Sequence, residues 1–262
     1  TIKVDTTRNV VNFSPTFDYR YRFNKQSMLR INYRGRTSQP SMTDLLPITD
    51  TSDPLNISKG NPSLKPSYTN SFMLFYNTFL PEKQQSMMAR LTFSNTINSV
   101  SNTVTYDEET GARITQPKNI NGNWSASGGF VFNTPLKNKK FTVSTFSDGS
   151  YNNMVGFTSL SGQTDSQKNT TRSLNLSERL NGTFRNDWFE FGLNGGIRYN
   201  VSKSTLQPQS DKETFDYSFG ASSNVTLPWD VTVSTDASYS MKRGYSEGLD
   251  RNELIWNAQI AK

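Results

Sequence analysis

The chain has 262 residues with 28 basic and 22 acidic side chains, and only 33% of its residues are hydrophobic although 12% are aromatic. It contains no Cys and no His, which excludes disulfides and thiolate metal sites and removes the commonest general base. We therefore expect no enzyme, no cofactor and no bound metal. The charges are scattered rather than gathered in blocks, so no nucleic-acid partner is expected.

The apolar content falls short of the roughly 45–50% that soluble domains use, even when glycine is counted. Two explanations remain open. The chain could be partly disordered, although disorder disfavours aromatic residues. Alternatively, it forms a sheet with one permanently wet face, so that half of its side chains need not be apolar.

The N-terminal segment 9–23, NVVNFSPTFDYRYRF, alternates with the two-residue period of a β-strand. Aromatic residues fall on one side and charged residues on the other, and segment 27–37 repeats the pattern. We predict that the aromatic side faces lipid and that five arginines face a wet lumen, namely Arg20, Arg22, Arg30, Arg34 and Arg36. They could attract an anionic substrate or pair with acidic groups of a plug, but salt bridges to Asp18 and to neighbouring strands are the favoured interpretation.

Further alternating segments follow along the chain. They lie at 67–79, 87–93, 124–132, 141–145, 174–180, 189–199, 215–227, 231–241 and 254–260, with Glu178 as a misfit on an apolar side. Residues 150–170 are polar and are predicted to form a loop. The pattern predicts about eleven strands, mostly of roughly 9–13 residues, which is the length of a tilted strand that crosses a membrane. No stretch has the periodicity of a helix or the length of a membrane helix.

The predicted connections alternate in length. Short ones lie at 24–26, 80–85, 133–139, 185–187 and 228–230, and longer ones at 37–66, 99–118, 150–170, 204–212 and 242–250. Outer-membrane barrels have short periplasmic turns and longer extracellular loops. We therefore predict an all-β fold, an antiparallel transmembrane β-barrel of about eleven meandering strands.

Aromatic residues also gather near the short turns. Phe23, Phe79, Trp188 and Trp229 would lie at one level, as in the aromatic girdles at the membrane–water boundary. The alternative is that these rings cap a soluble core.

The long segment 36–72 contains a run that resembles TonB-dependent receptors, and most closely the outer-membrane β-barrel family of Bacteroidetes. The matching pieces are Gln39-Pro40-Ser41, Leu45-Leu46-Pro47, Ser52-Asp53-Pro54 and Gly60-Asn61-Pro62-Ser63-Leu64-Lys65-Pro66, with later pieces at 119–136 and 253–262. Gln39 and Ser67 depart from the usual pattern. We expect Gly60 to take a positive φ, Pro62 to extend Asn61 and Pro66 to stop strand pairing. The motif of Gly60, Asn61, Pro62, Leu64, Lys65 and Pro66 is thus expected to be a rigid loop-to-strand junction without ligand contact.

Two acidic groups occur in the predicted loops. Asp44, Asp50 and Asp53 could bind a hard cation, but their spacing matches no calcium loop, so solubility of the loop is the favoured interpretation. Asp107-Glu108-Glu109, before Thr110-Gly111, is predicted to form a hairpin tip.

The resemblance implies a larger protein of which residues 1–262 are a partial barrel domain. A barrel of 22 strands, an N-terminal plug and a segment that binds TonB are expected outside this chain. The implied function is import of a large or scarce nutrient across the outer membrane, with lipid, the TonB complex and a surface lipoprotein as partners. Two alternatives stay open, a passive or structural barrel without a plug and a soluble, secreted β-rich binding module.

Overall fold

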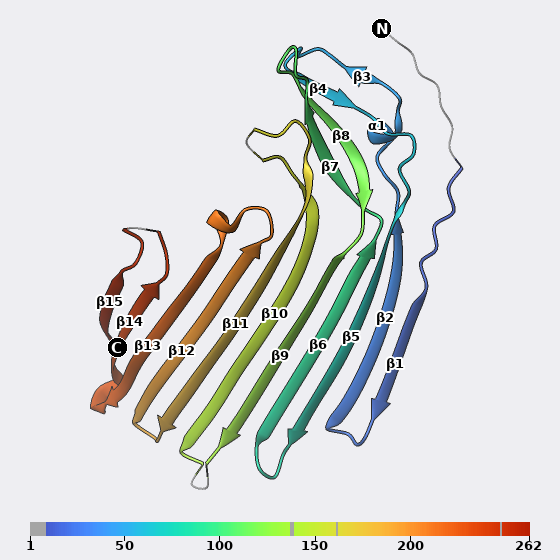
Figure 1. The fold of residues 1–262 in the computed structure, drawn as a ribbon. Coiled ribbons are helices and arrows are strands. Elements are labelled where there is room, and N and C mark those ends of the chain that lie inside the picture. The colour runs from blue at the N-terminus through green and yellow to red at the C-terminus, as the bar shows by residue number, and fades with distance from the viewer. Residues whose placement is uncertain (1–8, 137–138, 161, 247) are drawn as a thin grey trace.

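The computed structural model describes residues 9–136, 139–160, 162–246 and 248–262. Its main feature is one antiparallel sheet of eleven strands in which each strand pairs with the next in order (Figure 1). The strands are β1 (Thr16–Arg22), β2 (Ser27–Ser38), β5 (Ser67–Leu80), β6 (Gln85–Ile97), β9 (Asn123–Pro135), β10 (Phe141–Thr158), β11 (Gln167–Arg185), β12 (Phe189–Ser204), β13 (Lys212–Leu227), β14 (Val231–Arg243) and β15 (Asn252–Ala261). The predicted all-β meander is confirmed.

A second, smaller sheet of four strands stands above one end of the main sheet (Figure 1). It is built from β3 (Thr49–Asp50), β4 (Asn56–Lys59), β8 (Arg113–Ile120) and β7 (Ser99–Tyr106). We call it the loop platform, because it joins two connections of the main sheet through a parallel pairing of β4 with β8.

The helical elements are short: α1 (Met42–Leu45), η1 (Pro208–Ser210) and η2 (Pro228–Asp230). No helix in the described ranges has the length and hydropathy needed to cross a bilayer.

The main sheet has two chemically different faces, because alternate residues point to opposite sides. On the apolar face, the strand register places Tyr19 beside Ile31 and Ile31 beside Leu74. One residue along, on the polar face, Arg20 lies beside Arg30. The predicted division into an aromatic side and a charged side therefore holds across neighbouring strands.

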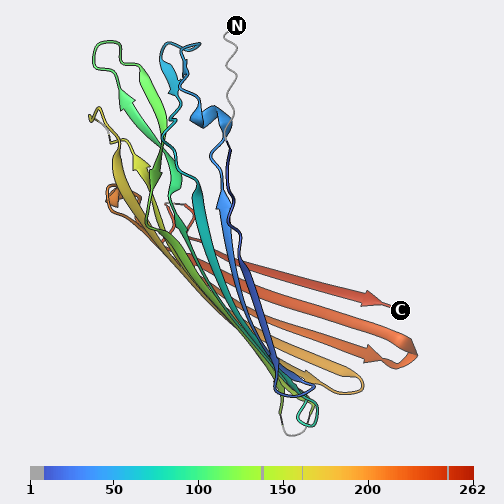
Figure 2. The same ribbon diagram turned by 90° about the vertical axis from the view of Figure 1, so that its right-hand side faces the viewer.

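The two ends of the strands also differ in the connections that they carry. The turns at 23–26, 81–84, 186–188 and 228–230 lie at one end of the strands, where β9 ends and β10 begins, and we call this end the short-turn edge. The longer connections lie at the opposite end of the strands, the long-loop edge (Figure 1). The two views show an open, curved sheet in which β1 and β15 are the outermost strands (Figures 1 and 2).

The prediction of a loop at 150–170 is wrong. Strand β10 continues to Thr158 and β11 begins at Gln167, so that Ser150 pairs with Asn175 and Thr158 with Gln167. On β11 every residue from Gln167 to Ser173 is polar, so the sequence does not alternate there, although the backbone ladder with β10 continues.

Buried apolar side chains are few, and they lie toward the long-loop edge. Among the described residues the buried hydrophobic side chains are Leu64, Ala112, Ile120 and Val155, besides Pro117 of β8, with Leu64 just 1% exposed. The apolar face of the sheet is instead open, with large side chains such as Leu91 and Leu176 exposed. The sheet thus has no conventional core, and its apolar face needs an apolar surrounding.

Candidate functional site

The five predicted lumen arginines all lie on the polar face of β1 and β2. The register adds a sixth, Arg90 of β6, which shares a row with Arg20 and Arg30 through Phe75. We call the six residues the arginine sector. Sequence reasoning missed Arg90, although its place between Ala89 and Leu91 on an alternating strand already put it on the polar side.

Asp18 is the centre of the ion pairs in the arginine sector. Its Oδ1 accepts a hydrogen bond from Nε of Arg20 at 3.0 Å, and its Oδ2 accepts one from Nε of Arg30 at 3.0 Å. The two arginines lie directly opposite each other, so Asp18 bridges two like charges. The predicted pairing with Asp18 is therefore present for these two arginines.

The rest of the arginine sector is unpaired. The side chains of Arg22, Arg34, Arg36 and Arg90 form no ion pair with any residue that the structure describes. Asp18 is the only carboxylate on the polar face of β1, β2, β5, β6 and β9, whereas the strands from β10 onward carry carboxylates such as Asp148 and Asp216 on this face. The arginine sector thus concentrates positive charge on one side of the polar face.

The loop motif connects three parts of the long-loop edge. The main-chain N–H of Asn61 donates to the carbonyl oxygen of Asp44 at 2.6 Å, and its side-chain Nδ2 donates to the carbonyl oxygen of Pro117 on β8 at 2.9 Å. The Nε2 of Gln116 donates to the carbonyl oxygen of Gly60 at 3.1 Å. Within the motif, Leu64 is buried. These contacts are those of a rigid junction.

The expectation for Gly60 is wrong, because Gly60 is not among the glycines with positive φ. Its role is close approach: a Cβ built there would lie 1.9 Å from the carbonyl oxygen of Leu46. Glycine is needed because a main-chain group fills the space that a side chain would take. After the motif, strand pairing begins at Ser67, directly after Pro66.

The loop acids are engaged by neighbouring residues in the chain. Asp50 accepts a hydrogen bond from the N–H of Ser52 at 3.0 Å, and Asp53 accepts one from the N–H of Leu55 at 3.0 Å. Hydrogen bonds from the Ser52 and Asn56 side chains, respectively, are the main reason that the pKa of each carboxyl lies below its usual value. The described residues contain no cluster of acidic side chains that could hold a metal ion.

The hairpin tip at Asp107 is formed as predicted. Strands β7 and β8 are antiparallel, and Gly111 between them has φ of 69°. The carboxylate of Asp107 accepts hydrogen bonds from the N–H and the hydroxyl of Thr110, both at 2.8 Å.

The four aromatic residues proposed as a girdle all lie at the short-turn edge. Phe23 follows β1, Trp188 precedes β12, and Trp229 lies in η2 with φ of 69°. Phe79 pairs with Ser86, which puts it on the polar face, unlike the aromatic residues Phe72 and Tyr76 of the same strand. These four residues therefore share an edge of the sheet but not one face.

A longer row of rings lies on the apolar face nearer the long-loop edge, and sequence reasoning did not single it out. Tyr33, Phe72, Phe93, Trp124 and Tyr151 follow one another across five strands, with ring centroids 4.8–6.4 Å apart. We call this the aromatic row. The alternation of the sequence places each ring on the apolar side of its strand. The sequence does not show the register between the strands, which aligns the rings in one row.

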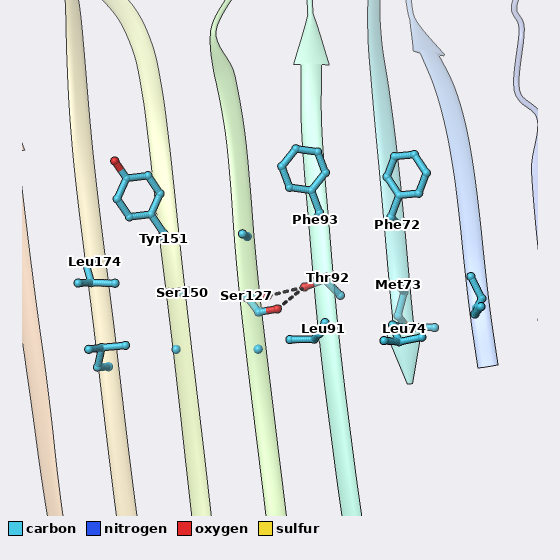
Figure 3. Close-up of a pocket in the computed structure, with 15 residues that line it drawn as sticks. Phe72, Met73, Leu74, Leu91, Thr92, Phe93, Ser127, Ser150, Tyr151 and Leu174 are labelled. Carbon is cyan, nitrogen blue, oxygen red and sulfur yellow. Dashed lines mark hydrogen bonds between the residues drawn. The ribbon is translucent and has the colours of Figure 1, made fainter. Parts of the chain in front are cut away.

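A shallow groove of about 540 Å³ follows the aromatic row on its side toward the short-turn edge. Its lining includes the paired glycines Gly128 and Gly149, and Leu91 and Leu176 lie close to them. Phe72, Phe93 and Tyr151 stand along one side of the groove (Figure 3). A hydrogen bond between Thr92 of β6 and Ser127 of β9 links two of the strands that the groove crosses (Figure 3). We call this the apolar-face groove.

Residues 1–187 match the sequence profile of the outer membrane protein beta-barrel family. The chain belongs to this family. No curated protein matches the sequence.

As a member of the outer membrane protein beta-barrel family, the chain resides in the outer membrane, with its apolar face toward lipid. One residue departs from this arrangement. Glu178 of β11 lies on the apolar face between Leu176 and Leu180, directly opposite Ser147 and Ile197. The hydroxyl of Thr145 donates a hydrogen bond to its carboxylate. The predicted misfit is therefore an acidic group that faces the membrane.

Proposed function

We propose that this chain is the barrel portion of a TonB-dependent outer-membrane receptor that imports a large or scarce nutrient. The observation that supports this most is the unpaired positive charge of the arginine sector. Buried or confined charges need counter-charges, and Arg22, Arg34, Arg36 and Arg90 have no acidic partner among the described residues. A plug domain inside the barrel, or an anionic substrate that passes it, would supply the missing negative charge.

The proposal includes parts outside this chain. Further strands complete a barrel of 22, and a plug with a TonB-binding segment lies N-terminal to the residues of this chain. A surface lipoprotein would bind at the long-loop edge, where the loop platform offers a structured surface. The barrel binds lipid and substrate, binds no nucleic acid, needs no cofactor and catalyses no reaction.

A passive or structural barrel without a plug is the second candidate. It has the same fold and the same location, but it leaves the arginine sector without a counter-charge. The third alternative, a soluble secreted module, does not agree with membership in an outer-membrane family.

The first experiment is to determine the full-length open reading frame and to confirm it by intact mass from the outer-membrane fraction. A receptor predicts an upstream plug and a TonB-binding segment. Deletion of the gene and deletion of the energy-coupling complex should then cause the same growth defect on the imported nutrient. Uptake that persists without the energy-coupling complex would contradict the proposal and favour the passive barrel.

A further inference from the structure

The apolar face changes abruptly from apolar to polar at the aromatic row. Phe72 pairs with Phe93, and Tyr151 pairs with Leu174. Ala126 of β9 lies between Phe93 and Tyr151 and completes this apolar row. The next row toward the long-loop edge contains Trp124 of the aromatic row and is otherwise polar, with Asn70, Asn95, Asn153, Arg172 and Lys203. Aromatic rings mark the boundary between hydrocarbon and headgroups in membrane barrels, so this step marks the boundary at the long-loop edge.

Two cations lie side by side in the polar row. Arg172 of β11 pairs directly with Lys203 of β12, and both side chains are exposed on the lipid side of the sheet. Neither forms an ion pair within the described part of the chain. Glu213, the carboxylate of the neighbouring β13 on this face, accepts a hydrogen bond from the hydroxyl of Tyr199 at 3.0 Å. The two cations outnumber this carboxylate and form no ion pair with it, so the Arg172–Lys203 pair keeps net positive charge at headgroup level.

The apolar-face groove begins directly beside these cations. Leu174, two residues from Arg172 on the same face of β11, lines the groove, as does Leu176. From there the groove runs across the strands over Gly149 and Gly128 to Leu91. Three strand spacings of about 4.8 Å make this a path of roughly 14 Å. Its walls are apolar, so it suits a hydrocarbon chain and cannot satisfy a polar ligand.

We propose that a phosphate-bearing lipid of the outer membrane binds at this place, with its phosphate at Arg172 and Lys203 and one acyl chain in the apolar-face groove. A cationic pair joined to an apolar groove is complementary to an anionic amphiphile with a charged head and a hydrocarbon tail. The site continues the lipid-facing surface of the barrel, which a membrane lipid covers. Long loops of outer-membrane barrels are extracellular, so the bound lipid belongs to the outer leaflet.

Trp124 provides a built-in reporter, because it lies in the same row as Arg172 and its ring is 5.0 Å from that of Tyr151 at the groove. The full-length protein is reconstituted into phosphatidylcholine bilayers that contain phosphatidylglycerol with brominated acyl chains, which quench tryptophan fluorescence at contact. A Trp124→Phe variant identifies the part of the signal that comes from Trp124. The expected result is stronger quenching by brominated phosphatidylglycerol than by brominated phosphatidylcholine.

Variants separate the two halves of the site. Arg172→Gln with Lys203→Gln should weaken the preference for phosphatidylglycerol by about ten- to thirty-fold, since each cation near a membrane surface contributes about a fivefold factor or less. Gly149→Leu should reduce quenching by filling the groove, because a Cβ there already meets Leu176 at 3.1 Å. Arg179→Gln is the matched control, since it removes the same charge from the polar face of the same strand.

Three results would overturn the proposal: equal quenching of Trp124 by the two brominated lipids, an unchanged preference in the double variant, or an equal loss in Arg179→Gln. Heat-modifiable mobility in gels shows whether each variant is folded before it is compared. Binding is measured without TonB or nutrient, so this test does not depend on the proposed receptor function.

Discussion

The side-chain amide of Asn119 pairs with both main-chain groups of Lys65. The N–H of Lys65 donates to Oδ1 of Asn119 at 2.7 Å, and Nδ2 of Asn119 donates to the carbonyl oxygen of Lys65 at 2.9 Å. The same Nδ2 also donates to the carbonyl oxygen of Asn98 at 2.9 Å. One side chain on β8 thus replaces a rung of a β-ladder and ties the loop motif to the β7–β8 hairpin.

Replacement of Asn119 by alanine should loosen the loop platform. Three hydrogen bonds are lost, and at about 0.5–1.5 kcal/mol for each net bond the local opening free energy should fall by about 1.5–4.5 kcal/mol. Hydrogen exchange of the β4 and β8 amides in the full-length protein measures this. Asn102→Ala on the same hairpin is the control, because the Asn102 side chain makes no hydrogen bond to a described residue. Equal exchange in the two variants would contradict the role of Asn119.

Gly60→Ala should also destabilise the loop platform, by steric conflict. The new methyl group would lie 1.9 Å from the carbonyl oxygen of Leu46, a main-chain atom that cannot move alone. We expect a cost of about 1–3 kcal/mol, as for other overpacked sites, measured as faster proteolysis of segment 40–66. Gly182→Ala is the matched control, because no atom lies within 4 Å of the built Cβ there. Resistance equal to that of the parent protein would show that the loop adjusts freely.

The hairpin tip at Asp107 should loosen in acid. The hydrogen bond from the N–H of Thr110 is the main cause that lowers the pKa of Asp107. A carboxyl with a lowered folded-state pKa stabilises above its unfolded pKa of about 3.9, and this contribution is lost as the pH falls through the folded value. Hydrogen exchange at residues 107–112, corrected for intrinsic rates, should therefore show increased opening below about pH 4.

Two substitutions at the hairpin tip test this assignment. Asp107→Asn keeps an acceptor oxygen but does not titrate, so the acid-induced opening should disappear. Glu108→Gln removes a neighbouring carboxylate that accepts no hydrogen bond from a described residue, and should leave the opening in place. Acid-induced opening that survives in Asp107→Asn would assign it to another group.

Glu178→Leu should stabilise the barrel in lipid. A charged side chain on the lipid face costs less for Glu than the ~2–4 kcal/mol found for Arg or Lys at mid-membrane, and the lost bond from Thr145 offsets part of the gain. We expect the free energy of unfolding in vesicles, from urea titration of the full-length protein, to rise by up to about 2 kcal/mol. Glu253→Leu makes the same change on the polar face of β15 and should bring no gain. Destabilisation by Glu178→Leu would instead show that the carboxylate has a partner in the membrane.

The main sheet was predictable because its physics is local. A strand that separates lipid from water must alternate, so Tyr19, Arg20 and Tyr21 alone indicate both strand and orientation. Where that demand ends, the prediction fails: β11 is polar on both faces from Gln167 to Ser173, yet it stays paired with β10. The ladder of backbone hydrogen bonds there does not depend on side-chain pattern.

The sites needed information that a single sequence does not contain. The place of Arg172 beside the groove, and of Arg90 in one row with Arg30, depends on the register between strands that are far apart in the chain. Gly60 could be recognised as a constrained position, but the constraint is the carbonyl of Leu46, which only the folded loop brings near. Asn119 gave no signal, because a single Asn in a polar segment is unremarkable until Lys65 lies beside it.

The scarcity of buried apolar residues has a practical meaning. Leu64, Ala112 and Ile120 belong to the loop platform and its supports, and Val155 lies toward the long-loop end of β10, so the described part of the eleven-stranded sheet has almost no interior of its own. For this sheet the surrounding amphiphile is a structural component and supplies the half of the hydrophobic contact that the polypeptide does not encode. The detergent or lipid used during extraction therefore takes the place that core residues have in a soluble protein. The yield of folded protein and the order of the sheet should vary with the acyl-chain length of that amphiphile, as they vary with core mutations in a soluble protein.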